Sequence, residues 1–286
     1  IATDSAGNIY VADGSFNLIR KITSTGVVTT LAGAGSLNAS LGQGTFFYLP
    51  VGVAVDLTGK VYVADNYFNR IRVITAPETV STLAGAITYG YADGIGTSAL
   101  FYEPTGVAVD NNTGNVFVVD QGNNMIRKIT PSGVVTTLAG MGSAQPGSVD
   151  GIGTAASFWQ PNGIAIDSKG NLYIADGSNN KIRKITQAGV VTTFAGIGGS
   201  AGGEIDGPAN VATFALPEGL TVDATDNVYV ADYFGNKIRK ITPDGVVSTI
   251  AGTGVAGSTD GTGSVAQFNG PMGVAIGGNG ILYVAD

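Results

Sequence analysis

The stretch Gly163-Ile-Ala-Ile-Asp-Ser-Lys-Gly-Asn-Leu-Tyr-Ile-Ala-Asp176, followed by Asn180-Lys-Ile-Arg-Lys-Ile185, decides the fold of this 286-residue chain. Its first part holds two short apolar runs that are joined by an Asp-x-x-Gly-Asn turn, and its tail is a further short run. Short apolar runs separated by tight turns are typical of antiparallel β-strands. Versions of this unit recur along the whole chain, so each residue must first be interpreted as part of a repeat.

The repeat is marked by the aspartate that closes each Val-Ala-Asp-like run, and the spacing is 52 to 56 residues: Asp13, Asp65, Asp120, Asp176, Asp232 and Asp286. Four strands, a to d, fit into a repeat, but the sixth repeat has only a and b. We therefore expect an all-β fold, a six-bladed β-propeller of four-stranded antiparallel blades whose sixth blade is incomplete. The expected blades within this single domain, 1–286, are 1–33, 52–85, 106–140, 163–196, 219–252 and a partial 273–286.

Long glycine-rich loops connect each strand d to the next strand a, and each ends with a Phe three residues before a Pro. We expect the Pro to fix the start of strand a and the Phe to fill the gap between successive sheets. The pairs are Phe47/Pro50, Phe101/Pro104, Phe158/Pro161, Phe214/Pro217 and Phe268/Pro271.

Composition excludes several classes of function. The net charge of −7 and the sequence pI of about 4.5 argue against nucleic acid, because a phosphate-binding face needs clustered Lys and Arg. The absence of Cys excludes thiol catalysis and disulfides, and the absence of His removes the commonest general base and transition-metal ligand. No apolar run is long enough for a membrane-spanning helix. The first residue, Ile1, falls inside an expected strand, which suggests a processed or partial chain.

The recurring Val-Tyr-Val-Ala-Asp run, the Asn-x-Ile-Arg-Lys-Ile segment and the glycine before strand a resemble the NHL repeat, over essentially the whole chain. The long loops, with Ala-Gly, Asp-Gly-x-Gly and Phe-x-x-Pro, resemble the secreted or surface-exposed bacterial branch. The resemblance implies a propeller. Relatives of this kind include receptor-kinase sensor domains, teneurins, RNA-binding regulators and a peptidyl-amidating lyase.

Residues shared by every repeat are expected to be structural. The Val-Ala-Asp aspartates and the asparagines four residues later should close loops through backbone N–H groups. The strand-c arginines should pair with carboxylates of their blades. The loop aspartates Asp93, Asp150, Asp206 and Asp260 offer one carboxylate each, whereas calcium loops need several oxygen ligands, so turn formation is the better interpretation. No catalytic residue, metal site or cofactor is predicted.

Residues that differ between repeats are the better candidates for recognition. The b–c loops are aromatic in repeats one, two and five and polar in repeats three and four, and the d–a loops of the same face carry further aromatic residues, Phe46, Tyr48, Tyr89, Tyr91 and Tyr102 among them. Grouped exposed aromatics suit contact with a protein or a carbohydrate; alternatively, each ring packs on its own loop. The predicted partner-binding residues are Phe16, Tyr67, Phe68, Tyr233, Phe234 and Trp159.

The sequence therefore favours an extracellular or cell-surface binding or structural propeller that is not an enzyme. Its partner would be a protein, a carbohydrate or a second copy that donates a strand to the incomplete sixth blade. The alternative is a metal-dependent lactonase or lyase with Glu103 and Glu218 as its only candidate ligands. Nucleic acid and membrane insertion are not expected. Asn38 and Asn111 begin Asn-x-Ser/Thr sequons and are candidate glycosylation sites.

Overall fold

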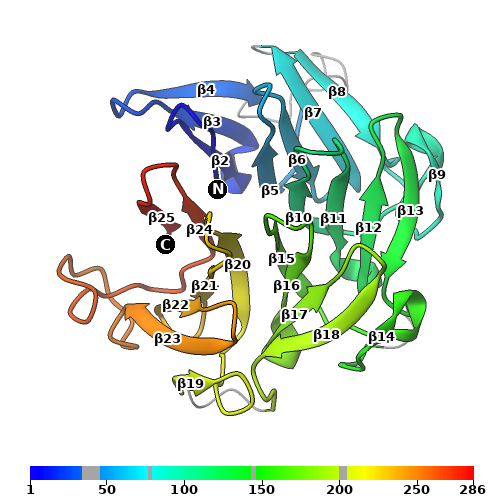
Figure 1. Ribbon diagram of the computed structural model, residues 1–286. Coiled ribbons are helices and arrows are strands. Elements are labelled where there is room, and N and C mark those ends of the chain that lie inside the picture. Colours follow the sequence, from blue (N-terminus) through cyan, green and yellow to red (C-terminus); the bar gives the residue numbers. More distant parts are fainter. Residues whose placement is uncertain (34–45, 77–78, 143–145, 200–204) are drawn as a thin grey trace. The chain divides into compact units, whose positions relative to one another are not determined.

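The computed structural model describes residues 1–33, 46–76, 79–142, 146–199 and 205–286. They form two compact units, Ile1–Leu138 with Gly277–Ile281 (unit 1) and Ala139–Ile276 with Leu282–Asp286 (unit 2). Nearly all regular structure is antiparallel β-sheet (Figure 1). Among the residues described, no helix has the length and apolar character needed to cross a membrane.

Successive hairpins build the sheets, each of which we call a blade. Blade 1 consists of β1 (Ala2–Thr3), β2 (Ile9–Asp13), β3 (Leu18–Ile22) and β4 (Val28–Gly33). Blade 2 consists of β5 (Pro50–Val55), β6 (Val61–Asp65), β7 (Arg70–Ala76) and β8 (Thr79–Ala84). Blade 3 consists of β10 (Pro104–Val109), β11 (Val116–Asp120), β12 (Met125–Ile129) and β13 (Val134–Ala139), with β9 (Gly94–Ile95) beside β13.

The same order continues along the chain. Blade 4 consists of β15 (Pro161–Ile166), β16 (Leu172–Asp176), β17 (Lys181–Ile185) and β18 (Val190–Ala195), with β14 (Gly151–Ile152) beside β18. Blade 5 consists of β20 (Pro217–Val222), β21 (Val228–Asp232), β22 (Lys237–Ile241) and β23 (Val246–Ala251), with β19 (Gly207–Pro208) beside β23. The remaining strands, β24 (Gly273–Ile276) and β25 (Leu282–Ala285), pair only with each other. Short 3₁₀ helices lie at Gly14–Phe16, Gly96–Ser98, Gln121–Asn123, Gly153–Ala155 and Gly177–Asn179.

The a–b hairpins turn as their sequence predicts. In blade 4, Asp167 Oδ1 accepts hydrogen bonds from the backbone N–H groups of Lys169 and Asn171 at 2.9 and 2.8 Å. Gly170 follows with φ of +78°, a left-handed conformation that a residue with a Cβ adopts at a cost. Asp56 and Gly59 repeat this arrangement in blade 2. The tight turn fixes the register of strands a and b, and thereby which side chains face the core.

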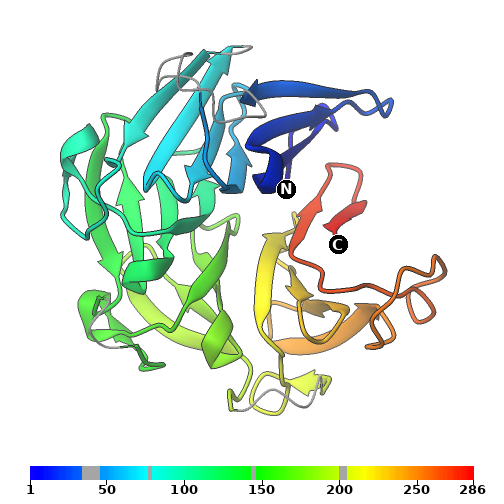
Figure 2. The same cartoon turned by 180° about the vertical axis from the view of Figure 1, so that it is seen from behind.

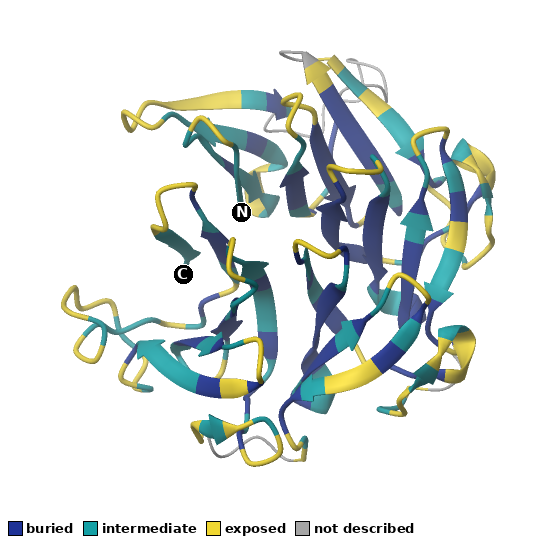
Figure 3. Ribbon diagram, viewed as in Figure 1, coloured by how far each residue is buried: buried dark blue, intermediate teal, exposed yellow. Residues whose placement is uncertain are grey.

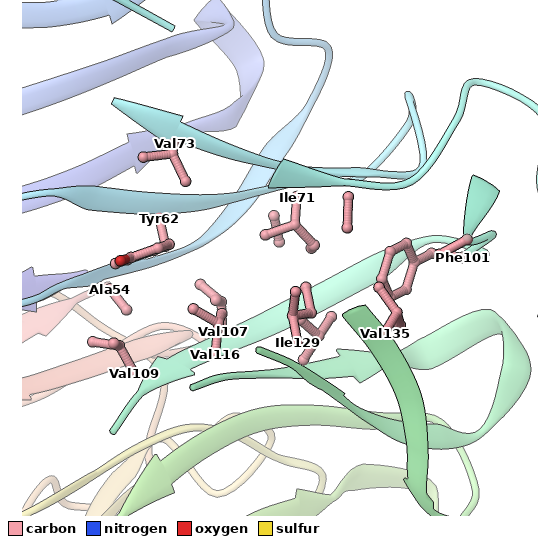
Figure 4. Packing of buried hydrophobic residues seen from close by; sticks show 14 residues of the cluster. Ala54, Tyr62, Ile71, Val73, Phe101, Val107, Val109, Val116, Ile129 and Val135 are labelled. Atoms are coloured by element: carbon pink, nitrogen blue, oxygen red, sulfur yellow. The ribbon is translucent and has the colours of Figure 1, made fainter. Parts of the chain in front are cut away.

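The core lies between neighbouring blades, where the expected plug phenylalanines are found. Phe101 is fully buried together with Ile71 and Ala84 of blade 2 and Ile129 and Val135 of blade 3 (Figure 4). Phe47 and Phe214 are buried in the corresponding clusters between blades 1 and 2 and between blades 4 and 5. Burying a Phe side chain contributes about 1.5–3 kcal/mol. The inner strands are mostly buried and the outer strands are partly exposed (Figure 3).

The prediction of a propeller is correct, but the prediction of six blades with an incomplete sixth is wrong. The structure has five blades, and the sixth a–b unit is a two-stranded sheet formed by β24 and β25. The sequence-based count is too high because an a–b unit by itself does not make a blade. A blade also needs strands c and d, and within the described part of the chain nothing pairs with β25 other than β24.

The prediction of four strands per blade also needs correction. In blades 3, 4 and 5 a fifth, two-residue strand from the preceding connection pairs antiparallel with strand d, as in the register Val134↔Ile95 and Val135↔Gly94. Both sides of the molecule show this segment beside β13 (Figures 1 and 2). The Asp-Gly-x segments, predicted as simple turns, therefore protect the outer edges of three sheets.

Candidate functional site

Each of blades 2 to 5 contains a buried ion pair between strands b and c. The aspartate that ends strand b and the arginine of strand c are both almost inaccessible to solvent. In blade order, the distances from arginine Nη1 to aspartate Oδ2 are: Asp65–Arg72 3.3 Å, Asp120–Arg127 2.7 Å, Asp176–Arg183 2.8 Å and Asp232–Arg239 2.9 Å. The prediction that the strand-c arginines pair with blade carboxylates is confirmed for these four, whereas Arg20 of blade 1 forms no ion pair with a described residue.

The second oxygen of each aspartate accepts a backbone N–H group, but the donor belongs to the connection that enters the blade and not, as predicted, to the loop that follows strand b. Oδ1 accepts the backbone N–H of the residue after the plug phenylalanine: Tyr48, Tyr102, Trp159 and Ala215 donate at 2.7 to 2.9 Å. The guanidinium lies over the ring of the same phenylalanine, with Cζ 5.2 Å from the centroid of Phe101 for Arg127. The Asp–Arg ion pair therefore lies where a blade contacts the connection that precedes it.

The loop aspartates bind the other side of the same arginines. Arg127, Arg183 and Arg239 donate through Nη2 to Asp93, Asp150 and Asp206 at 2.7, 2.6 and 2.7 Å. The hydroxyls of Thr137, Thr193 and Thr249 on strand d donate to the same carboxylates. Each of these three aspartates therefore fastens a connection to the outer half of a blade. Across the part of the chain that the structure describes, no three His, Cys, Asp or Glu side chains gather as metal ligands would.

Burial changes the acidity of this pair. It raises the pKa of Asp65 and of Asp120 to about 6, although the Arg72 and Arg127 guanidiniums and the donated N–H groups act in the opposite direction. The pKa of Arg72 is lowered, because burial disfavours the charged guanidinium more than Asp65 stabilises it. An ion pair without solvent access suits a structural role rather than ligand exchange.

Aromatic side chains collect on the loops of unit 1, where b–c loops and connections alternate. We call Tyr48, Tyr67, Phe68, Tyr89 and Tyr102 the tyrosine surface. The ring centroids of Tyr48 and Tyr67 are 4.2 Å apart, and those of Tyr89 and Tyr102 are 5.0 Å apart. Phe68 lies 5.8 Å from Tyr48. Tyr67 and Tyr89 are exposed, whereas Phe68 is half-buried beneath its neighbours.

Of the remaining predicted binding residues, Phe16 belongs to unit 1 and is 63% exposed. The other three lie in unit 2, on loops of blades 4 and 5. Phe234 is 62% exposed and packs edge-on against half-buried Tyr233, with centroids 5.0 Å apart. Trp159 is exposed and accepts, through its backbone oxygen, the N–H of Ser178 in the b–c loop of blade 4. The six residues are therefore distributed over both units.

Leu49 is an exposed apolar residue that sequence reasoning missed. It has φ of +53° and donates its N–H to Asn17 Oδ1 of the preceding b–c loop at 2.9 Å. Glu103 and Leu216 occupy the same position before a proline, with left-handed φ values and N–H bonds to Asn69 and Asn180. The signal in the sequence was the recurring Phe-x-x-Pro segment, because the residue just before its proline is the one that adopts the left-handed conformation. Phe46, by contrast, is buried.

The two glutamates considered as metal ligands occupy different positions. Glu103 is exposed, lies before Pro104 and belongs to unit 1. Glu218 is inside β20 of unit 2, and burial raises its pKa to about 7. For the sequons, Asn111 is exposed in the a–b turn of blade 3, and its Oδ1 accepts the N–H of Leu57. Asn38 lies outside the described residues.

Comparison with known proteins gives matches along the chain. The family model described as the NHL repeat matches residues 47–74 and 101–129, and the one described as the teneurin NHL domain matches residues 143–204. The chain is 28% identical over 334 residues to teneurin-3 of Danio rerio, which covers 100% of this chain and 12% of that protein. It is 27% identical over 329 residues to NHL repeat-containing protein 2 of Homo sapiens, covering 83% of this chain and 45% of that protein. The chain thus spans less than half the length of these relatives.

Solved structures share the fold. An auxiliary nutrient binding protein from Bacteroides thetaiotaomicron superimposes with a TM-score of 0.71 at 15% identity, covering 98% of this chain and 63% of that chain. Streptogramin B lyase superimposes with a TM-score of 0.60 at 17% identity, covering 99% of this chain and 74% of that chain. At such identities the similarity concerns the fold and carries no function.

Proposed function

Because the chain is an NHL-repeat β-propeller, we propose that it is a non-catalytic binding module whose partner contacts the tyrosine surface. The observation that carries the proposal is the division of labour among its residues. The Asp and Arg residues that the blades share already bind one another and the connections between blades, whereas the exposed aromatic residues differ from blade to blade. Tyr67, at 61% exposure, lies on a supporting ring, which limits the entropy lost when a partner binds.

The composition of these loops fits a protein or carbohydrate partner. Exposed tyrosines combine a large apolar face with a polar hydroxyl, and the neighbouring Gly, Ser and Asn residues supply adaptable hydrogen bonds. The net charge of −7 disfavours nucleic acid. The similarity to teneurins supports a binding role and an extracellular or cell-surface location, which we include in the proposal.

A metal-dependent lactonase or lyase has less support. The related fold includes virginiamycin B lyase from Staphylococcus aureus, for which a histidine-to-alanine variant is catalytically inactive. This chain contains no histidine. Glu103 and Glu218 lie in different units and have no third carboxylate gathered with them in the described residues.

The proposal is tested by screening the chain against a glycan array and a panel of extracellular proteins, followed by titration of the best ligand. The double variant Tyr67→Ser/Tyr89→Ser should weaken binding at least tenfold, because both rings are exposed and neither fills the core. The control Leu57→Ser changes an exposed apolar residue on an a–b turn and should leave binding unchanged. A ligand that binds equally well to all three proteins would refute the role of the tyrosine surface.

A further inference from the structure

One position at the start of strand a differs from blade to blade. It lies between the proline that begins the strand and the glycine that allows neighbouring first strands to approach each other. The residues at this position are Val51, Thr105, Asn162, Glu218 and Met272. Glu218 alone among them has an ionisable side chain. The flanking Pro and Gly are shared, so this position is where blades can differ without losing that packing.

Three of these residues are neighbours in unit 2. A Cβ on Gly163 of β15 would clash with the backbone carbonyl oxygen of Glu218 in β20, so these two strands touch at their starts. The N–H of Gly219 in β20 donates to the carbonyl oxygen of Met272 at 2.9 Å. Asn162, Glu218 and Met272 therefore follow one another across β15, β20 and the segment that leads into β24, and the start of β20 has a neighbouring segment on both sides.

The Glu218 carboxyl group has no compensating partner. It forms no hydrogen bond or ion pair with any residue that the structure describes, and burial raises its pKa to about 7. Asp65 and Asp120, whose pKa values burial also raises, each bind an arginine instead. Glu218 is only half-buried and its oxygens are not sealed from solvent, so a ligand can reach them. A cation that binds there would offset the cost of partly burying the carboxylate.

Apolar and aromatic residues lie on the segments that lead to this position. Leu216, two residues before Glu218, is half-buried, and its carbonyl oxygen accepts the N–H of Tyr233 at 3.3 Å. The Tyr233 ring lies against the next segment, because a Cβ on Gly270 would be 2.9 Å from its Cε2. Two residues after that glycine, Met272 is 61% exposed. Tyr233 thus contacts both the segment before Glu218 and the segment before Met272.

We propose that the start of β20 binds an alkylammonium group, which supplies the cation that Glu218 lacks. The ammonium N–H groups donate to the Glu218 carboxylate, and the aliphatic stem packs against Leu216, Tyr233 and Met272. An alkylammonium group has its charge at one end and apolar surface along its length, which matches this arrangement of residues. The lysine side chain of a partner and a free primary amine both carry the group, and the net charge of −7 attracts either. The inference goes beyond the proposed function and does not depend on the tyrosine surface.

Other cations fit this position less well. Ca²⁺ needs several oxygen ligands, and among the residues that the structure describes no three acidic side chains gather around one point. A guanidinium has more N–H donors than an ammonium. The buried guanidiniums of Arg127, Arg183 and Arg239 each bind two carboxylates, whereas Glu218 offers only one. A single accessible carboxylate beside apolar residues therefore favours an ammonium group.

The test follows the glutamate carboxyl carbons by ¹³C NMR while the whole chain is titrated with n-butylammonium chloride at constant ionic strength. The glutamates of the sequence are Glu78, Glu103, Glu204 and Glu218, and Glu218→Gln identifies the signal of the last. At about pH 8 the Glu218 carboxyl group is ionised and the amine is protonated. We expect a saturable shift of the Glu218 signal. At saturation, protonating Glu218 should require at least tenfold more acid, because the bound cation stabilises the carboxylate.

The controls separate the charge from the apolar contacts. 1-Butanol, which lacks the charge, should bind at least tenfold more weakly. The signal of exposed Glu103 should stay unchanged in the same sample. Met272→Ser should weaken the binding of n-butylammonium at least threefold. Val51→Ser changes an exposed apolar residue at the same position of blade 2 and should not affect it.

A second titration, with N-acetyl-lysine methylamide, distinguishes the two sources of the group. Binding of both compounds assigns the site to a lysine side chain, and binding of n-butylammonium alone assigns it to a free amine. Tyr67→Ser/Tyr89→Ser should bind n-butylammonium normally, so a failure of the tyrosine surface leaves this result unaffected. Absence of saturation, an equal shift at Glu103, or a shift of Glu218 by Ca²⁺ at lower concentrations than by n-butylammonium would each overturn the proposal.

Discussion

At the residue scale, the strand-c arginines of blades 3, 4 and 5 each join two carboxylates that differ in their environment. Arg127 donates to Asp120 and to Asp93, both at 2.7 Å, but Asp120 is fully buried and the Asp93 side chain is 49% exposed. Water screens and can replace the second interaction, whereas it cannot reach the first. Equal distances should therefore correspond to unequal contributions to the free energy of unfolding.

Replacing the two partners separately tests this expectation. Asp120→Ala leaves the Arg127 charge buried without its fully buried partner and should lower the free energy of unfolding by about 3–5 kcal/mol. Asp93→Ala removes a half-exposed partner and should cost about 1 kcal/mol or less. Urea unfolding followed by circular dichroism measures both values. Equal losses would mean that solvent exposure does not determine the strength of this pair.

The sequence predicted the Asp–Arg pairs because both residues recur at a fixed spacing within one hairpin. It did not predict that Asp93 binds Arg127, since the two are far apart in sequence and meet only when the connection lies along the outer strand. For the aromatics it located the loops correctly. It could not distinguish exposed Tyr67 from half-buried Phe68, because adjacent loop residues have no periodic pattern that separates inside from outside.

At the scale of elements, glycines allow neighbouring first strands to approach each other. A Cβ on Gly163 of β15 would clash with the backbone carbonyl oxygen of Glu218 in β20, and one on Gly52 of β5 would clash with that of Thr105 in β10. Neither glycine has a positive φ, so contact between strands, rather than backbone conformation, requires the small residue. The close packing of strand a of one blade against strand a of the next thus requires a glycine, which has no side chain.

Gly163→Ala should therefore lower the free energy of unfolding by about 1–3 kcal/mol, because the backbone of β20 must move away. The matched control is Gly278→Ala, which adds the same methyl group where no atom lies within 4 Å and the φ is not in the left-handed region. That change should alter stability by less than about 0.5 kcal/mol. Thermal unfolding compares them, and a similar shift in Tm for both would contradict the steric argument.

Most strands were predictable because alternation of apolar residues and Asp-x-x-Gly turns marks them. The fifth strands were not, since Gly94–Ile95 is too short to carry a pattern and pairs with a strand distant in sequence. The number of blades was also overestimated. Strand b of the last repeat, Leu282–Ala285, has the same sequence pattern as the others, yet a pattern does not show whether further strands pair with it.

At the scale of the whole molecule, two sets of carboxyl groups oppose each other in their response to pH. Burial raises the pKa of Glu218 to about 7 and those of Asp65 and Asp120 to about 6. In a second set burial acts in the same direction, but hydrogen bonds to the carboxylate outweigh it and lower the pKa. This set is Asp4, Asp56, Asp150, Asp206 and Asp223.

The two sets predict a stability maximum in mildly acidic solution. Groups with raised pKa values bind protons more tightly in the folded chain, so stability rises as the pH falls from about 7 toward 4.5. Groups with lowered pKa values stabilise the folded chain above about pH 4 and lose this contribution below it. Urea midpoints between pH 8 and pH 3 should pass through a maximum. Glu218→Gln should reduce the rise by on the order of 1–2 kcal/mol, and an unchanged profile would contradict the assignment.

In several blades an asparagine side chain accepts the N–H of the residue before the proline, and this has a consequence for where the length of a connection can change. Asn17, Asn69 and Asn180 fix the end of a connection, and in three connections an aspartate eight residues before the phenylalanine fixes its middle. The residues ahead of that aspartate carry the differences in length. Insertions there should leave the blades undisturbed, so evolution and protein engineers alike have a tolerant position for grafting new sequences.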